Sequence, residues 1–165
     1  GKLLPQSSTS SLEALVIFLR CYKFTTSWDG TIEQPSLADD LVAYALTFEG
    51  YDYVYGGTTP AGFDCSGFTM YIYKQFGYSL PHSATSQWLS GMGTKIYSIS
   101  ELQPGDLVFF NDPSRNKGKA CSHAGIYIGN GQHVHASSSR NGGVITSDLT
   151  SGYYNTYFVG GLRLS

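Results

Sequence analysis

The strongest constraint on the fold is a single change in the period of the apolar residues along the chain. Between residues 36 and 89, apolar side chains recur at three- and four-residue steps, which is the period of a helix packed on one face. Beyond Glu101, they fall in short runs separated by Gly and Asn, which is typical of strands joined by tight turns. Helices first and strands later predict an α+β fold with an antiparallel sheet.

Capping residues place the helices. Ser36, Asp64 and Ser83 each precede an apolar stripe, where a side-chain oxygen can accept the unpaired N–H groups of a first helical turn. The helices are expected from Ser36 to Gly50, from Cys65 to Gly77 and from Ser83 to Leu89, and the glycine-rich stretch 51–62 is expected to be a loop. The strands are expected at 106–111, 124–128, 132–136, 144–147 and 157–164.

Residues 1–35 differ from the rest of the chain. A polar stretch precedes residues 12–24, which can form one helix, and an irregular stretch follows. We interpret 1–35 as a linker or N-terminal extension, or as the end of a neighbouring module, and residues 36–165 as one domain.

Charge and cysteine content exclude several classes of protein. The net charge is −2 and there is no basic stripe, so nucleic acid is not an expected partner. No apolar run approaches the roughly 20 residues that span a bilayer. The cysteines are Cys21, Cys65 and Cys121, and an odd number cannot all pair within the chain. A Cys21–Cys121 disulfide stays open, but a disulfide scaffold is not what holds the fold.

Cys65 is the candidate nucleophile. It follows Asp64 at the expected start of a helix, where unpaired N–H groups and the positive end of the helix dipole are expected to lower the pKa of a thiol. The same N–H groups can bind the oxyanion that forms during acyl transfer. The alternative is a buried, inert cysteine.

A base for this thiol is expected on the segment 121–136, which we interpret as a hairpin turning at residues 129–131. With a three-residue loop, Ile126 faces Val134, Ile128 faces Gln132 and Gly125 faces His135. His123 and His135 then share one face as diagonal neighbours, so that His123 can act as base and His135 can orient it. A two-residue loop would put the two imidazoles on opposite faces.

Other uses of these residues stay open. His133 lies further along the same face, where we expect a merely polar side chain. His82 stands in a turn, where we expect a surface residue rather than one at the rim of the site. Cys121, His123, His133 and His135 together could also hold zinc, although their spacing is shorter than usual zinc patterns and leaves Cys65 without a role.

Five blocks of sequence resemble the NlpC/P60 cysteine peptidases, in the order and at the spacing of that family. The resemblance covers about residues 37–165. The blocks are Tyr53-Val-Tyr-Gly-Gly57, Gly62-Phe-Asp-Cys-Ser-Gly67, Leu102-Gln-Pro-Gly-Asp-Leu-Val-Phe-Phe110, Ser122-His-Ala-Gly-Ile-Tyr-Ile-Gly129 and His135-Ala136. Tyr55 stands where the family usually has tryptophan, and His82 where arginine is common.

The resemblance implies a papain-like fold, with N-terminal helices packed on an antiparallel sheet of five or six strands. It implies Cys65 as nucleophile, His123 as base and His135 as the orienting residue. It further implies a tyrosine hydroxyl near the nucleophile and three residues that line the substrate groove. These are Tyr53 for the hydroxyl, and Asp64, Ser66 and Ser122 for the groove.

The implied substrate is a peptidoglycan stem peptide, cut between D-γ-glutamate and a diamino acid such as meso-diaminopimelate or lysine. Thiol chemistry of this type needs no cofactor or metal. We expect a monomer that is secreted or attached to the cell surface, because its substrate lies outside the cytoplasm; a wall-binding or lytic module at its N-terminal side is a further expectation. Two alternatives remain at this point, a catalytically silent module that binds wall peptides and a papain-like amidase or acyltransferase.

Overall fold

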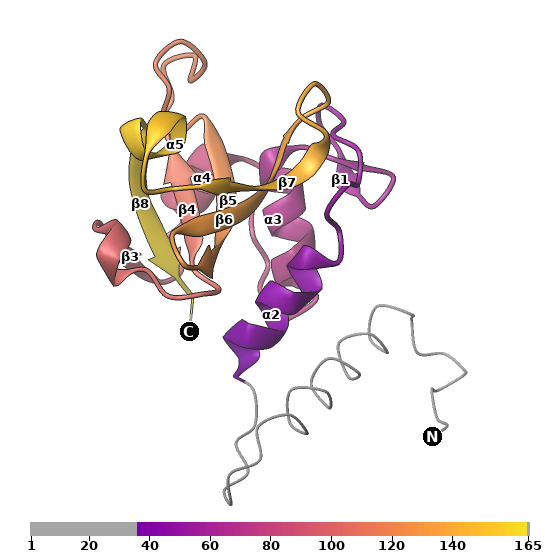
Figure 1. The fold of residues 1–165 in the computed structure, drawn as a ribbon, viewed down its shortest axis with the longest axis horizontal. Coiled ribbons are helices and arrows are strands. Elements are labelled where there is room, and N and C mark those ends of the chain that lie inside the picture. Colours follow the sequence, from indigo (N-terminus) through magenta and orange to yellow (C-terminus); the bar gives the residue numbers. More distant parts are fainter. Residues whose placement is uncertain (1–35, 165) are drawn as a thin grey trace, which may run out of the picture.

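The computed structural model describes residues 36–164, which form an α+β domain (Figure 1). A six-stranded antiparallel sheet has the order β3-β8-β4-β5-β6-β7, and β1 and β2 form a separate two-stranded sheet. The strands are β1 Thr58–Thr59, β2 Gly62–Phe63, β3 Thr94–Ile96, β4 Leu107–Phe110, β5 His123–Gly129, β6 Gln132–Ser138, β7 Gly143–Asp148 and β8 Phe158–Arg163. The expected helix at 12–24 lies outside the described residues.

The three expected helices form, and each begins at its expected cap. They are α2 Leu37–Leu46, α3 Cys65–Lys74 and α4 Ala84–Trp88. The Ser36 hydroxyl accepts the Asp39 N–H at 3.1 Å, and the Asp39 carboxylate accepts the Ser36 N–H at 3.4 Å, which makes a reciprocal capping box. None of the helices between residues 36 and 164 is long and apolar enough to cross a bilayer.

Short elements complete the fold where no periodic pattern marks them. The segment expected to be a loop, 51–62, contributes β1 and the first residue of β2. β3 pairs with β8 at one edge of the large sheet, a 3₁₀ turn spans Ile99–Glu101, and α5 spans Gly152–Thr156. Two- and three-residue strands are too short to show an alternating pattern, which explains why the sequence does not predict them.

The β5–β6 hairpin differs from its expected form in one respect. Ile126 pairs with Val134 as expected, but Gly129 rather than Ile128 pairs with Gln132. The turn holds two residues, Asn130 and Gly131, both with positive φ, and Ile128 is an extra residue that forms a β-bulge. The turn is one residue shorter than expected, and the bulge makes β5 one residue longer. The two changes cancel, so His123 and His135 still share a face.

Apolar clusters lie on both faces of the sheet. The larger one joins α2, α3 and α4 to the inward side chains of β4, β5 and β6, including Phe68, Phe109 and Ile126. The smaller one contains Phe110 and Tyr127, with Tyr154 of α5 packed against it. Strand β5 therefore lies between a helical layer that carries Cys65 and a face that carries the imidazoles.

Candidate active site

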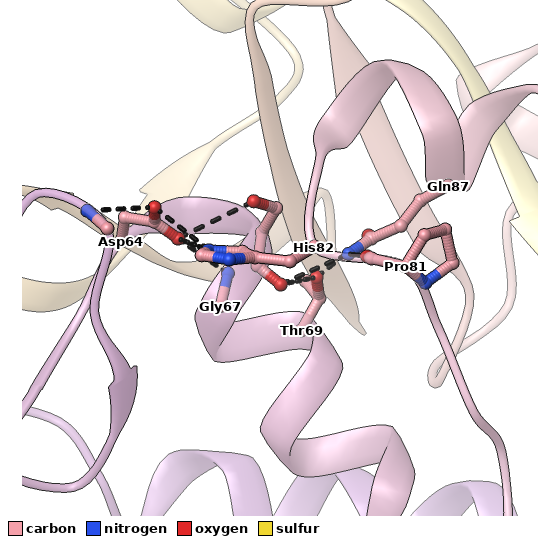
Figure 2. Close-up of polar contacts among 8 residues, drawn as sticks. Asp64, Gly67, Thr69, Pro81, His82 and Gln87 are labelled. Carbon is pink, nitrogen blue, oxygen red and sulfur yellow. Dashed lines mark hydrogen bonds and ion pairs between the residues drawn. The ribbon is translucent and has the colours of Figure 1, made fainter.

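Asp64 fixes the start of α3. One of its carboxylate oxygens accepts the Gly67 N–H at 2.6 Å, and the other accepts the Gly56 N–H at 3.1 Å (Figure 2). A Cβ at Gly67 would lie 1.9 Å from the carbonyl oxygen of Gly57, so only glycine allows the helix and the loop to approach this closely. The carboxylate therefore ties the loop before β1 to the helix that begins with Cys65.

His82 contacts the same carboxylate. Its Nε2 lies 3.0 and 3.1 Å from the two oxygens of Asp64 (Figure 2). His82 lies at the surface, as expected, and its ring in addition forms an ion pair with Asp64 when protonated. A turn residue 18 positions away in sequence gives no local sign of this contact.

Gln87, which the sequence analysis did not single out, supports the first turn of α3 from α4. Its buried amide nitrogen donates to the carbonyl oxygens of Ser66 at 3.1 Å and Pro81 at 2.8 Å, and its amide oxygen accepts the Thr69 hydroxyl at 2.8 Å (Figure 2). Three bonds from one buried amide hold the helix terminus in a single position relative to α4.

The Cys65 thiol lies at the N-terminus of α3 and is partly exposed. Burial raises its pKa to about 11, while N–H groups, first that of Ala124 on β5, lower the pKa by a smaller amount. The expectation of a lowered pKa is therefore wrong for the resting protein, since desolvation outweighs the helix terminus. The Ala124 N–H also places the sulfur beside β5, at the residue that follows His123.

We expect no thiolate on Cys65 at pH 7. The absorbance at 240 nm of the wild type minus that of Cys65→Ala should stay near zero between pH 4 and 8, because a group with a pKa of about 11 is protonated throughout this range. Cys121 is present in both proteins and cancels. A thiolate band that is already present at pH 7 would instead show a resting ion pair with a histidine.

The structure brings His123 and His135 together. Nε2 of His123 lies 2.7 Å from Nδ1 of His135, and Nε2 of His135 lies 2.8 Å from the Ser147 hydroxyl on β7. His123 is partly exposed, whereas His135 is fully buried. Because Nε2 of His123 is engaged, Nδ1 is the nitrogen left to exchange a proton with the thiol.

His133 is a further part of this array, and the expectation of a merely polar side chain there is wrong. It is fully buried and stacks on His135 with ring centroids 4.2 Å apart. Its Nδ1 lies 3.1 Å from the carbonyl oxygen of Ser147, so Nδ1 carries the proton, and Nε2 has no hydrogen-bond partner. A Cβ at Gly125 would lie 2.7 Å from the His133 ring, so the glycine makes room for the stack.

All three imidazoles are neutral at pH 7. Burial, with Arg115 adding to it, lowers the pKa of His123 to about 4. Burial and the neighbouring His123 lower the pKa of His133 to about 3, and burial holds the pKa of His135 well below its usual value. A neutral His123 can accept a proton from the thiol, which is what a general base requires.

A cleft of about 570 Å³ opens beside His123. It lies between the loop that follows β4, the turn between β6 and β7, and helix α5. Its lining residues are Arg115, Ser122, His123, Ser137, Ser138, Ser139, Arg140, Asn141, Tyr153 and Tyr154. Only Ser122 and His123 were singled out from the sequence, because the other residues lie on loops and a short helix whose approach is set by the sheet.

The expected groove residues divide between two places. Ser122 lines the cleft, and its hydroxyl accepts the Asp112 N–H at 2.9 Å. Tyr53 and Ser66 do not line it, and Asp64 is engaged at the helix cap. Burial, followed by the nearby Cys65 and Asp64, raises the pKa of Tyr53, which puts this phenol on the nucleophile's side of the site.

No group of three or more His, Cys, Asp or Glu side chains within residues 36–164 is arranged to hold a metal ion. The arrangement that these residues do show is a thiol at a helix N-terminus, a neutral imidazole on the adjoining strand and a second, buried imidazole behind it. This set of groups suits nucleophilic attack by sulfur with proton transfer to nitrogen.

Comparison with known proteins relates this geometry to one family. The sequence model of the NlpC/P60 family matches residues 50–163. The gamma-DL-glutamyl hydrolase of Bacillus subtilis is 35% identical over 160 residues, which cover 91% of this chain and 37% of that protein. The bifunctional muramidase/DL-endopeptidase CwlT of the same organism is 41% identical over 116 residues, which cover 70% of this chain and 33% of that protein.

A solved structure agrees with the sequence matches. The NlpC/p60 domain of the peptidoglycan hydrolase SagA superposes with a TM-score of 0.64 at 31% identity, over 78% of this chain and 100% of that one. The papain-like α+β fold expected from the sequence is thereby confirmed. The chain spans only about a third of the length of the two curated relatives.

Proposed function

Because the chain belongs to the NlpC/P60 family, we propose that it is a cysteine endopeptidase that hydrolyses peptidoglycan stem peptides between D-γ-glutamate and a diamino acid. The observation that carries the proposal is the 2.7 Å contact between His123 and His135, on the strand whose Ala124 N–H reaches the Cys65 sulfur. The relatives are named a gamma-DL-glutamyl hydrolase and a DL-endopeptidase, and these names support the choice of bond.

The mechanism follows from the protonation states. The Cys65 thiol passes its proton to Nδ1 of His123 as the sulfur attacks the amide carbonyl, and N–H groups at the start of α3 stabilise the oxyanion. Nε2 of His123 then donates to Nδ1 of His135, whose Nε2 proton is donated to Ser147. The imidazolium protonates the leaving amine, and water hydrolyses the thioester.

The neutral resting pair has a consequence for this step. A thiol with a raised pKa and an imidazole with a lowered pKa do not exchange a proton in the free protein. The transfer therefore accompanies the attack on bound substrate, when the developing oxyanion and the bound peptide offset the cost of separating charge. Tyr53, on the nucleophile's side, is proposed to contact the acyl part of the substrate.

We also propose that the protein acts outside the cytoplasm, at the cell wall or after secretion. The support is chemical, because the proposed substrate is a wall polymer, and the relatives carry the names of wall hydrolases. Residues 1–35 are proposed to be a linker or an N-terminal extension of this domain.

Mass spectrometry of muropeptides tests the proposal. Purified peptidoglycan digested with the protein should yield fragments that end in D-γ-glutamate and fragments that begin with the diamino acid. Cys65→Ala protein serves as the control for contaminating hydrolases. Release of intact stem peptides from the sugar would instead identify an amidase, and binding of the wall without any new fragment would identify a silent module.

A further inference from the structure

The cleft beside His123 carries positive charge and no acidic side chain. Arg115 and Arg140 line it from two different loops, together with hydroxyl and amide groups of Ser, Asn and Tyr. Both arginines are exposed, and neither guanidinium forms a hydrogen bond or ion pair with another residue in the range 36–164. Within residues 36–164 no carboxylate contacts either guanidinium, although Arg115 adds to the hydrogen bonds from Tyr153 and Ser114 that lower the pKa of Asp112.

The positive charge of Arg115 affects the pKa values of side chains that line the cleft. Burial lowers the pKa of His123, and Arg115 adds to this effect. Burial raises the pKa of Tyr153 and of Tyr154, and Arg115 offsets part of that rise. The carboxylate that belongs to the same loop, Asp112, accepts hydrogen bonds from Tyr153 at 2.7 Å and from Ser114, and it does not line the cleft. On this loop, Arg115 therefore lines the cleft, whereas Asp112 is hydrogen-bonded to Tyr153 and Ser114 outside the cleft lining.

The position of the base tells which part of a substrate the cleft receives. The imidazolium of His123 must donate a proton to the leaving amine, so that amine lies within hydrogen-bond reach of the ring. His123 lines the cleft, whereas Cys65, Tyr53 and Asp64 do not. The cleft therefore holds the residue that carries the leaving amine, and the acyl part lies on the side of Asp64 and Tyr53.

In the proposed reaction, the leaving residue is the diamino acid. Meso-diaminopimelate and lysine differ at the far end of the side chain, where diaminopimelate carries a carboxylate in addition to the amine. A guanidinium binds a carboxylate through charge-assisted and often bidentate hydrogen bonds, and it repels an isolated ammonium group. Two unpaired guanidinium groups in one cleft thus favour the diamino acid with the extra carboxylate.

On the basis of the proposed function, we infer that Arg115 and Arg140 bind the side-chain carboxylate of the leaving diamino acid and make the protein selective for meso-diaminopimelate over lysine. Asn141 lines the same cleft, and its amide oxygen can accept a hydrogen bond from the amine beside that carboxylate, while its amide nitrogen donates to the Ser137 hydroxyl at 3.0 Å. Selectivity here is a difference between two affinities, and it arises from repulsion of lysine as well as from attraction of the carboxylate.

Three tetrapeptides of the form L-Ala-γ-D-Glu-X-D-Ala test the inference. X is meso-diaminopimelate, the same residue with its side-chain carboxyl amidated, or L-lysine. The amidated peptide removes one negative charge at nearly constant shape. Wild-type kcat/KM should be about 10-fold or more higher for the acid than for the amide, and lowest for lysine, as expected for a hydrogen bond to a charged group. Equal values for acid and amide would overturn the inference.

Charge-removing variants locate the effect. Arg115→Gln and Arg140→Gln should each bring the acid-to-amide ratio of kcat/KM closer to 1, and the double variant should abolish the preference. Lys119→Gln is the matched control, because Lys119 is exposed on the same loop but does not line the cleft, and its ratio should equal that of the wild type. A double variant that keeps the wild-type ratio would contradict the assignment.

A binding measurement tests the anion site independently of the proposed cleavage reaction. Calorimetry with Cys65→Ala protein should show that the acid tetrapeptide binds about 10-fold more tightly than the amide, and that Arg140→Gln in the same background reduces this difference. Such binding without turnover in the wild type would overturn the proposed endopeptidase activity and still support the anion site. Equal affinities would refute the anion site whatever the wild-type protein cleaves.

Discussion

Replacement of Cys65 by alanine is expected to lower kcat/KM for stem-peptide cleavage by about 1,000-fold or more, because no other group at the site can form the acyl intermediate. The free energy of unfolding should change little, since the thiol is partly exposed and the cap on Asp64 stays in place. Liquid chromatography of a defined tetrapeptide digest measures the rate, and urea denaturation measures stability.

Two controls make this result specific. Cys121→Ala removes the other described cysteine, which is buried in the core, and should keep the wild-type rate with a modest loss of stability. The double variant Cys65→Ala/His123→Ala should be no slower than Cys65→Ala alone, because the two groups act in one step. Wild-type turnover by Cys65→Ala would refute the assignment of the nucleophile.

Acidification is expected to destabilise the protein strongly through its buried imidazoles. The unfolded chain binds a proton on His133 near pH 6.5, but the folded protein does so only near pH 3. The contribution of neutral His133 to the free energy of unfolding is therefore fully present above pH 6.5, and it is lost as the pH drops from 6.5 towards 3. A shift from 6.5 to about 3 corresponds to about 5 kcal/mol at 1.36 kcal/mol per pKa unit, which is a large part of a typical domain's stability.

Urea denaturation at intervals between pH 7.5 and 4 measures this loss. His133→Asn should be less stable than the wild type at pH 7.5, because the stacked ring is lost, but its stability should fall less steeply with acid. The asparagine amide can still donate to the Ser147 carbonyl, which His133 Nδ1 contacts in the native protein. An unchanged slope in this variant would show that His133 does not cause the acid sensitivity.

Local features of the chain were predicted well. The caps at Ser36, Asp64 and Ser83 depend on side chains within three residues of the helix start, so the sequence contains the whole signal. The five longer strands follow from apolar runs between turn residues. The placement of Cys65, His123 and His135 depended on the hairpin register and on the family resemblance, and the structure brings the two histidines together.

Features that depend on distant contacts were not predicted. The pKa of Cys65 depends on how deeply the helix terminus is packed against β5, and local reasoning from the helix end alone gave the wrong direction. The stack of His133 on His135 requires the empty space at Gly125 and the face of Phe110. The cleft arginines lie on loops that meet only after the sheet has formed, so no spacing in the sequence links Arg115 to Arg140.

The bulge at Ile128 also limits how proteins with this architecture can diverge. A single-residue insertion or deletion at the Asn130-Gly131 turn would rotate one histidine out of the site unless a compensating change arose at the bulge. The turn between β6 and β7 has a weaker constraint: its residues 139–142 can change in length without moving the imidazoles, provided that Ser147 keeps its place opposite His133. Natural variation and loop grafting should therefore concentrate at that turn, where new specificities can be acquired with the chemistry left intact.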